Sequence, residues 1–347
     1  MGLLEAQSYF CHHPENMTCS KRFQSIAANI MLYVAFMTGI LLATFGNLVV
    51  IISISHFKQL HTPTNVLTLS LAATDFLIGI FIMPVRTVRT MNACWYFGDI
   101  ICMAEVFCYP TLTTISVCHL IFLAIDRYFS VCYPLLYTTK ITINISFVFI
   151  AICWLVPVFY MVLFMFFYFD LIFSTGDHCL ELCATITFFT LVTVDMFLTF
   201  MLPCSVMLGL YCKIFIVAMQ HARAIQVEKR KLDFVGKEHN KQSEKSQNKA
   251  TRTIGIVIFT FILCLFPFYV CQLLQGFIDY SILIKEIFEY IALFNFAFNP
   301  IIYGLFYPWF RKAFRMMVTW LRIYLSIRLS KKKSSISLFD FAQYCIY

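Results

Sequence analysis

Seven long apolar stretches constrain this chain more than any other feature of its sequence. Each could cross the apolar core of a bilayer, which takes about 20 mostly apolar residues. The stretches cover approximately residues 27–55, 63–90, 99–131, 144–167, 187–217, 251–276 and 284–306. Hydrophobic residues make up 61% of the chain and charged residues 13%, whereas soluble domains carry about 45–50% and about 25%. We therefore expect an all-α membrane protein, a bundle of seven transmembrane helices.

The basic residues predict how the chain is oriented, because cytoplasmic loops are enriched in Lys and Arg. With the N-terminus outside, only five of the 26 basic residues are extracellular: Lys21, Arg22, Arg86, Arg89 and Lys285. We expect a multi-pass protein of the plasma membrane with three parts. These are an extracellular segment 1–26, a transmembrane domain 27–306 with its third cytoplasmic loop at about 218–250, and a C-terminal part 307–347. The last part begins with a short amphipathic eighth helix at about 308–320, which is expected to lie against membrane lipid.

Composition and motifs exclude several classes of function. The net charge is +8, but the basic residues lie in loops between apolar stretches and no nucleic-acid-binding motif accompanies them. The chain has no Gly-rich phosphate loop, no H-E-x-x-H pattern and no nucleophile–base pairing, so we expect no enzyme. An ion-coupled transporter is a distant alternative, because Asp75 and Asp195 lie inside expected spans. The internal repeats typical of such transporters are not visible in the sequence.

One carboxylate lies in the middle of the fifth expected span. The stretch TFFTLVTVDMFLTFMLP runs from Thr187 to Pro203, and Asp195 is its one charged residue. An ionised Asp at the centre of a membrane helix costs about 2.5–3.5 kcal/mol. A cationic ligand would remove this cost, since a buried carboxylate and a buried ammonium each relieve the other's desolvation. The alternative is a protonated Asp that is hydrogen-bonded to a neighbouring helix.

An ordered set of motifs accompanies the spans, one for each. The set consists of GNLVV (Gly46 to Val50), SLAATDF with Asp75, Asp126-Arg127-Tyr128, Trp154, Pro203 followed by Tyr211, FILCLFP ending at Pro267, and NPIIY (Asn299 to Tyr303). This set resembles the rhodopsin-like G-protein-coupled receptors. Three further strings, ISHFKQLHTPTN (54–65), CWYFGD (94–99) and FYPWFRKAFRMM (306–317), resemble trace amine-associated receptors, which are chemosensory receptors for volatile amines.

The resemblance implies how the chain would signal. Arg127 would meet a heterotrimeric G protein after the sixth span swings out, and Asp126 would hold Arg127 at rest. The other residues implied in coupling and activation are Tyr128, Tyr211, Asn299, Pro300 and Tyr303. The implied G protein is the stimulatory or olfactory type, which raises cyclic AMP, with arrestin and a receptor kinase as further partners. The alternative for Asp126 and Arg127 is a salt bridge without a signalling role.

The resemblance also implies two disulfides and an ion site. Cys102 would pair with Cys183, and Cys179 would pair with Cys11 or Cys19. Asp75, Ser116, Asn295 and Asn299 would hold an allosteric sodium ion, with a hydrogen-bonded core that lacks an ion as the alternative. No other cofactor is expected. The sequon that starts at Asn16 lies on the expected outer side, where it can be glycosylated.

The ligand site departs from the usual amine-receptor pattern. Such receptors carry their counter-ion seven residues after Cys102, where this chain has Tyr109. A tyrosine has a pKa of about 10 and cannot neutralise an ammonium at pH 7. The resemblance instead points to Asp195, eight residues and a little over two helical turns before Pro203, as in a branch prominent in fish. Tyr109 and Thr113 would line the site, and Phe268 and Tyr269 would offer cation–π contacts.

Further residues bear on the choice of ligand. Leu265, Leu293 and Phe296 stand where relatives often have Trp, Tyr and Ser. Glu289 would add a second anion and favour a diamine or polyamine, unless it pairs with Lys285 one helical turn away. We therefore expect an olfactory receptor for protonated amines, with a receptor for a non-amine ligand, such as a steroid, lipid or peptide, as the alternative.

Overall fold

The computed structural model describes residues 26–92, 97–175, 189–231, 241–274 and 282–331. Within these ranges every element of regular secondary structure is a helix. The chain divides into two compact units, Met1–Phe306 and Tyr307–Tyr347. The first unit holds the helical bundle and every site discussed below.

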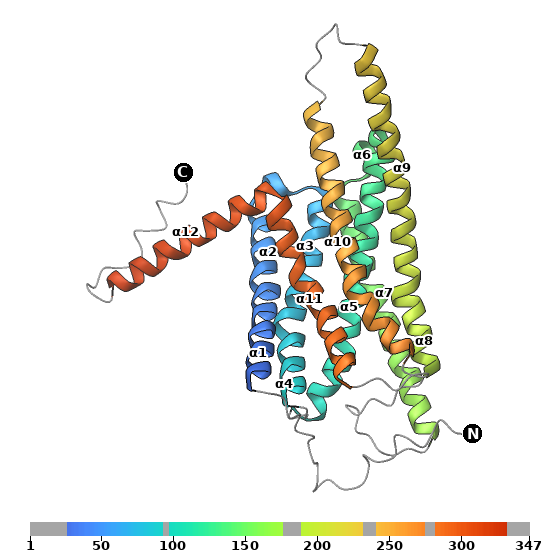
Figure 1. The fold of residues 1–347 in the computed structure, drawn as a ribbon, viewed down its shortest axis with the longest axis vertical. Helices are drawn as coiled ribbons and strands as arrows, with labels where there is room; N and C mark the ends of the chain where they lie inside the picture. Colours follow the sequence, from blue (N-terminus) through green and yellow to red (C-terminus); the bar gives the residue numbers. More distant parts are fainter. Residues whose placement is uncertain (1–25, 93–96, 176–188, 232–240, 275–281, 332–347) are drawn as a thin grey trace. The chain divides into compact units, whose positions relative to one another are not determined.

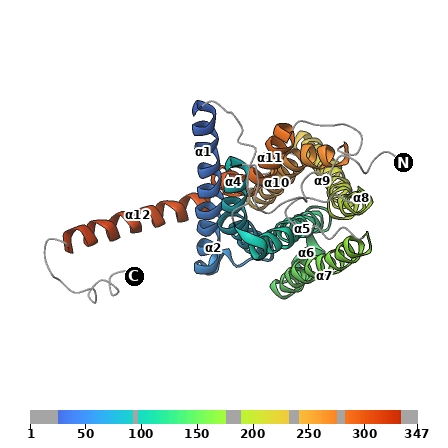
Figure 2. The same ribbon diagram turned by 90° about the horizontal axis from the view of Figure 1, so that it is seen from below.

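The helices of the first unit form the spans expected from the apolar stretches (Figure 1). In chain order they are α1 (Ile26–Leu41), α2 (Asn47–His56), α3 (Pro63–Leu77), α4 (Met83–Asn92), α5 (Gly98–Cys132), α6 (Pro134–Lys140), α7 (Ile143–Thr175), α8 (Phe189–Met196), α9 (Leu202–Lys231), α10 (Lys241–Leu274) and α11 (Ile282–Phe306). Seen along the bundle, α5 lies between the other helices and packs against α3, α7, α9 and α10 (Figure 2).

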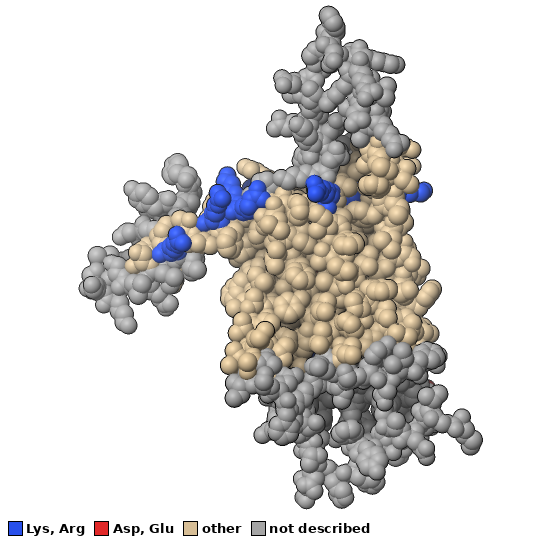
Figure 3. All heavy atoms as spheres, viewed as in Figure 1, with Lys and Arg blue, Asp and Glu red and all other residues tan. Residues whose placement is uncertain are grey.

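The described helices have the lengths and apolar surfaces of membrane spans. Six of them are long and apolar enough to cross a bilayer, and α11 makes a seventh when it is counted together with the helix that follows it. In the second span 61% of the most apolar stretch of 18 residues is buried inside the protein, whereas in the fourth span 17% is buried. The fourth span therefore lies at the periphery of the bundle. Figure 3 shows a broad uncharged band across the bundle, with Lys and Arg at its upper edge. The all-α membrane class is confirmed.

Local sequence signals explain where two of the helices begin. The Thr62 hydroxyl accepts a hydrogen bond from the Asn65 backbone N–H at 3.3 Å, and Pro63 occupies the first turn of α3. A threonine cap followed by proline is a favoured helix start. Gly98 begins α5 with a φ of 72°, a left-handed conformation that glycine adopts without steric cost.

Three spans contain a π-helical turn that the apolar pattern did not predict. These turns cover Leu42–Gly46, Ile78–Ile82 and Phe197–Met201. The second and third come just before Pro84 and Pro203, which lack an N–H and clash with the carbonyl one turn earlier in a regular helix. A π turn relieves this conflict by adding one residue to the turn. The first turn packs on the second, since a Cβ on Gly79 would lie 2.9 Å from Ala43 Cβ.

The helices on either side of the expected third cytoplasmic loop extend into it. α9 continues to Lys231 and α10 begins at Lys241, so much of the 218–250 region is helical. Both helices extend beyond the bundle at the end where α6 lies (Figure 1).

The second unit contains α12 (Pro308–Lys331), which is longer than the predicted helix at 308–320. No Gly or Pro follows Pro308 within it, so nothing in the sequence ends the helix after three turns. Its surface carries exposed basic side chains (Arg311, Lys312, Arg315 and Arg322) and exposed apolar ones (Phe314, Met316, Ile323 and Tyr324). This mixture is typical of a helix at a membrane surface.

The first and seventh spans approach closely at a glycine. A Cβ added to Gly46 would lie 2.6 Å from Pro300 Cβ and 2.7 Å from Pro300 Cγ. The neighbouring Asn47 donates its side-chain N–H to the Phe296 carbonyl at 3.1 Å. The motifs GNLVV and NPIIY therefore meet in the bundle.

We expect Gly46→Ala to destabilise the receptor, because the proline ring cannot move aside and such overpacking costs about 1–3 kcal/mol. The measurements are the thermal unfolding midpoint in detergent and antibody staining of surface protein in transfected cells. Gly209→Ala is the matched control, because nothing lies within 4 Å of a Cβ at that position. Equal stability of the two variants would contradict the close approach.

Candidate functional site

Asp195 lies at the end of α8, just before a π-helical turn, and is half-buried. Its carboxylate accepts a hydrogen bond from the Tyr160 hydroxyl of α7 at 2.9 Å. The Thr199 hydroxyl donates to the Asp195 carbonyl oxygen at 2.8 Å, which fixes the backbone across the turn. Among the ion pairs of the described chain, none involves Asp195. Its carboxylate is therefore held by a neutral donor.

Aromatic side chains of the fifth and sixth spans contact one another. The Tyr269 ring stacks on Phe200 with centroids 4.2 Å apart, and Phe268 meets Tyr269 edge-on at 5.5 Å. Helix α10, which carries Tyr269 and Phe268, packs against α8, which carries Asp195, and against α5, which carries Tyr109. The structure thus brings together the helices whose residues the sequence had assigned to one site.

Tyr109 and Thr113 are buried on α5. The Thr113 hydroxyl donates to the Tyr109 carbonyl oxygen at 2.8 Å, so it is engaged by its own helix. The Tyr109 ring packs in an apolar cluster with Leu293 and Phe296. Leu293 and Phe296, which stand where relatives often have Tyr and Ser, therefore pack in the same cluster as Tyr109.

An ionic cluster joins the second, third and seventh spans. Arg86 of α4 donates from Nε to Glu105 of α5, and its Nη1 pairs with Glu289 of α11. The guanidinium carbon lies 3.8 Å from the centroid of the Tyr109 ring. Arg89 Nη1 is 3.9 Å from the second Glu105 oxygen. The Tyr290 hydroxyl also donates to the Arg86 carbonyl oxygen at 3.2 Å.

This cluster changes the interpretation of Glu289. Its partner is Arg86 from the second span, whereas the sequence suggested either a free second anion or a pair with Lys285. The Lys285 side chain lies outside the described residues. Arg86 and Glu105 were missed as a pair, although each lies in an expected span where an unpaired charge is costly. The cost of an unpaired charge, considered for the second and third spans together, could have identified Arg86 and Glu105 as partners.

Asp75 is fully buried and hydrogen-bonded through both oxygens. Ser116 donates to one oxygen at 3.3 Å, and the Asn299 amide donates to the other at 2.7 Å. Asn295 is also buried, on α11. Oxygen atoms of a carboxylate and a hydroxyl suit a hard cation such as sodium, whereas Asn299 presents its nitrogen to Asp75. Two of the other three predicted ligands thus contact Asp75 directly.

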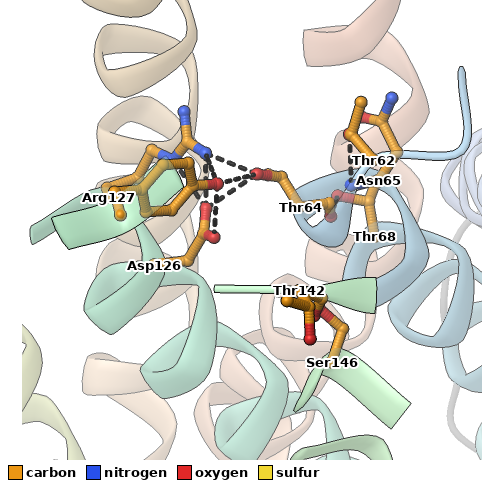
Figure 4. A network of polar contacts seen from close by, with 9 residues as sticks. Thr62, Thr64, Asn65, Thr68, Asp126, Arg127, Thr142 and Ser146 are labelled. Atoms are coloured by element: carbon orange, nitrogen blue, oxygen red, sulfur yellow. Dashed lines mark hydrogen bonds and ion pairs between the residues drawn. The ribbon is translucent and has the colours of Figure 1, made fainter. Parts of the chain in front are cut away.

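A network around Arg127 closes the end of the bundle that holds α6. Arg127 pairs with its neighbour Asp126 and also donates to the Thr64 hydroxyl of α3 (Figure 4). Thr64 donates to Asp126 at 2.7 Å, and the Tyr137 hydroxyl of α6 donates to the other Asp126 oxygen at 2.9 Å. Burial raises the pKa of Tyr137, and the Asp126 carboxylate raises it further. The phenol therefore stays protonated and keeps donating.

Thr64 and Tyr137 are parts of this network that the sequence did not identify. The available signal was weak, since Thr64 lies in the first turn of α3 and Tyr137 in the short helix α6, and neither carries a charge. Of the other predicted signalling residues, Tyr128 is partly buried and Tyr303 is buried on α11. The ring of Tyr211 lies against Gly255 of α10, where a Cβ would be 2.9 Å from Tyr211 Cε1. The fifth and sixth spans therefore pack tightly near their inner ends.

Cys102, on α5, is disulfide-bonded. Its expected partner Cys183 lies outside the described residues, as do Cys179, Cys11, Cys19 and the sequon at Asn16. These assignments stay predictions.

Comparison with known proteins identifies the family. Residues 46–303 match the model of the 7 transmembrane receptor (rhodopsin family). The chain is 40% identical over 316 residues to trace amine-associated receptor 4 of Mus musculus. This alignment covers 89% of the present chain and 91% of the mouse receptor. The chain is 39% identical over 332 residues to trace amine-associated receptor 13c of Danio rerio (91% and 94%), and 38% identical over 320 residues to trace amine-associated receptor 1 of Homo sapiens (89% and 93%).

The match to the family model covers residues 46–303, which include every charged cluster described above. The matches confirm the expectation that the protein is not an enzyme, and they leave no ground for the transporter alternative. A receptor family explains why the motifs occur in order, one for each span. The chain belongs to the trace amine-associated receptors, within the rhodopsin family of seven-transmembrane receptors.

Proposed function

We propose that a protonated amine activates this receptor by binding to Asp195. The observation that carries the proposal is the environment of this carboxylate. Asp195 is half-buried and bonded to neutral Tyr160, whereas Asp126, Glu105 and Glu289 each have an arginine. Among the described residues its charge has no cationic partner, so an ammonium is the group that would complement it.

The aromatic rings of the neighbouring helix support the same ligand class. Tyr269 and Phe268 lie on α10, which packs against the helix of Asp195, and cation–π contacts from such rings contribute about 0.5–2 kcal/mol. The related receptors are named for trace amines, which agrees with a small organic cation. Tyr109 is not an anion, and the Arg86 guanidinium already lies over the face of its ring. Asp195 therefore takes the role of counter-ion for the ligand's ammonium.

The signalling part of the proposal is an olfactory receptor of the plasma membrane with its N-terminus outside. Agonist binding shifts the bundle toward an active form that engages a stimulatory or olfactory-type G protein and raises cyclic AMP. Arrestin and a receptor kinase act on the activated receptor. The network of Arg127, Asp126, Thr64 and Tyr137 supports this proposal, because it ties the arginine to three helices in a form that can be released.

We expect Asp195→Asn to reduce amine potency by at least about thirtyfold, because removing one partner of a buried charge pair costs about 2–5 kcal/mol. The amide keeps the hydrogen bond from Tyr160 but supplies no charge. The assay is a cyclic AMP reporter in transfected cells, with a panel of amines and surface staining. Asp170→Asn is the control, an exposed acid on α7. Full potency in Asp195→Asn would reject the anchor, and silence of the unmodified receptor toward every amine would favour a non-amine ligand.

We expect Tyr137→Phe to raise basal cyclic AMP about two- to tenfold. The substitution removes one hydrogen bond to Asp126, which contributes about 0.5–1.5 kcal/mol, and loosens the hold on Arg127. Tyr33→Phe, on an exposed tyrosine of α1, is the control at equal surface expression. Unchanged basal signalling would show that the network does not restrain the resting receptor.

We expect sodium to lower basal signalling in the unmodified receptor and to have no effect in Asp75→Asn. A cation that binds the resting form better shifts the equilibrium toward it, and the amide carries no charge to hold the cation. Membranes with added G protein are assayed in sodium and in potassium at the same ionic strength. Equal sodium sensitivity of both receptors would assign Asp75 to a hydrogen-bonded core without an ion.

A further inference from the structure

Arg86 is a cation of the receptor itself, held inside the bundle by groups suited to a ligand's ammonium. Its side chain is 14% exposed and contacts carboxylates from two other spans, Glu105 (3% exposed) and Glu289 (27% exposed). Its guanidinium also lies over the Tyr109 ring. Two carboxylates and an aromatic face are the elements that recognise organic cations.

The charges of the cluster show what the loss of Arg86 would leave behind. Glu105 has two basic neighbours, because Arg89 lies 3.9 Å from its second oxygen. Glu289 pairs with Arg86 alone among the ion pairs of the described chain. Without Arg86, Glu289 becomes a partly buried carboxylate that pairs with no other cation among the described side chains, which is the condition in which Asp195 is found.

The helices that carry Tyr109 and Tyr269 link this cluster to Asp195. The Arg86 guanidinium lies over the Tyr109 ring of α5, and α5 packs against the π-helical turn that follows Asp195. Helix α10, which carries Tyr269, packs against both α5 and α8, so these helices connect an amine on Asp195 with the Arg86 cluster. A second ammonium on the same ligand would be directed toward a place that already holds a positive charge.

We propose that Arg86 occupies the subsite of a second ammonium, and that this makes the receptor selective for amines with a single charge. This inference rests on the proposed function, with Asp195 as the anchor of the first ammonium. Glu289 is then the carboxylate that would bind the second ammonium of a diamine, and its pairing with Arg86 prevents this. The proposal reverses the preference for diamines that Glu289 suggests when it is considered without its partner.

A tethered cation has advantages over a ligand group that competes for the same carboxylate. Arg86 is already part of the fold, so its pairing costs no translational freedom, whereas a free ligand loses it on binding. Its planar guanidinium reaches two carboxylates at once, which an ammonium does less well. Like charges also repel, so a distal ammonium near Arg86 is disfavoured beyond simple competition.

The first experiment uses the unmodified receptor. Linear alkyl monoamines, the α,ω-diamines of the same chain lengths, and the corresponding amino alcohols are compared in the cyclic AMP assay. The expected result is that each diamine is at least about tenfold less potent than its monoamine, while the neutral hydroxyl is tolerated better than the second ammonium. Diamines that are more potent than matched monoamines would overturn the proposal without any mutation.

The second experiment removes the tethered cation. Arg86→Gln is expected to raise the ratio of diamine to monoamine potency by at least about tenfold, and adding Glu289→Gln to this variant is expected to abolish the gain. Arg89→Gln is the matched control, because Arg89 lies on the same helix but is 38% exposed and more distant from Glu105. It should leave the ratio within about twofold of the unmodified receptor.

A third variant keeps the test valid if Arg86→Gln fails to reach the surface. Arg86→Gln combined with Glu105→Gln removes one buried charge of each sign and leaves Glu289 as the unpaired anion. The expected result is again a gain in relative diamine potency that depends on Glu289. If the ratio of diamine to monoamine potency is unchanged in a variant that reaches the surface, the ionic cluster only holds the helices together and the proposed subsite is rejected. This holds even if Asp195→Asn abolishes monoamine signalling. Failure of every amine on the unmodified receptor would instead reject the proposed function and this inference with it.

Discussion

The cost of an unpaired charge in an apolar bundle governs the arrangement of this receptor. Neither lipid nor close-packed helices can replace the hydration of an ion, so each buried charge needs a partner from the protein or from a ligand. Arg127 has Asp126, and Arg86 has two carboxylates from other spans. Asp75 accepts two hydrogen bonds. These pairings fix which helices are neighbours, and they leave Asp195 as the place where a cation from outside has most to contribute.

Much of the fold could be predicted from the sequence, because its signals are local. An apolar stretch predicts a span without reference to the rest of the chain, and Thr62-Pro63 predicts the start of α3 in the same way. Asp195 was also found from one stretch alone, since a carboxylate among apolar residues is conspicuous wherever that stretch packs. Tyr269 followed from the family resemblance, and the helix that carries it packs against the helix of Asp195.

The ionic cluster of Arg86 could not be found in this way, because it depends on the juxtaposition of three spans. Periodicity gives the face of one helix but not which residue on another helix meets it. A pair within one helix, Lys285 with Glu289, was therefore considered, while the partner from the second span was not. The same reasoning explains why Thr64 and Tyr137 were missed, since they lie on α3 and α6 and reach Asp126 of α5 only through the packing of these helices.

The π-helical turn at Phe197–Met201 determines where Asp195 points. Counting 3.6 residues per turn back from Pro203 assumes a regular helix, whereas a π turn contains one residue more than an α-helical turn. The outer end of the fifth span is therefore rotated relative to its inner end, by about 100° for that one residue. In this rotated position Asp195 receives the hydrogen bond from Tyr160. Deletion of a single residue within the turn would change which face of α8 meets α7 and α10, so the length of this segment is as important to the proposed amine site as the carboxylate itself.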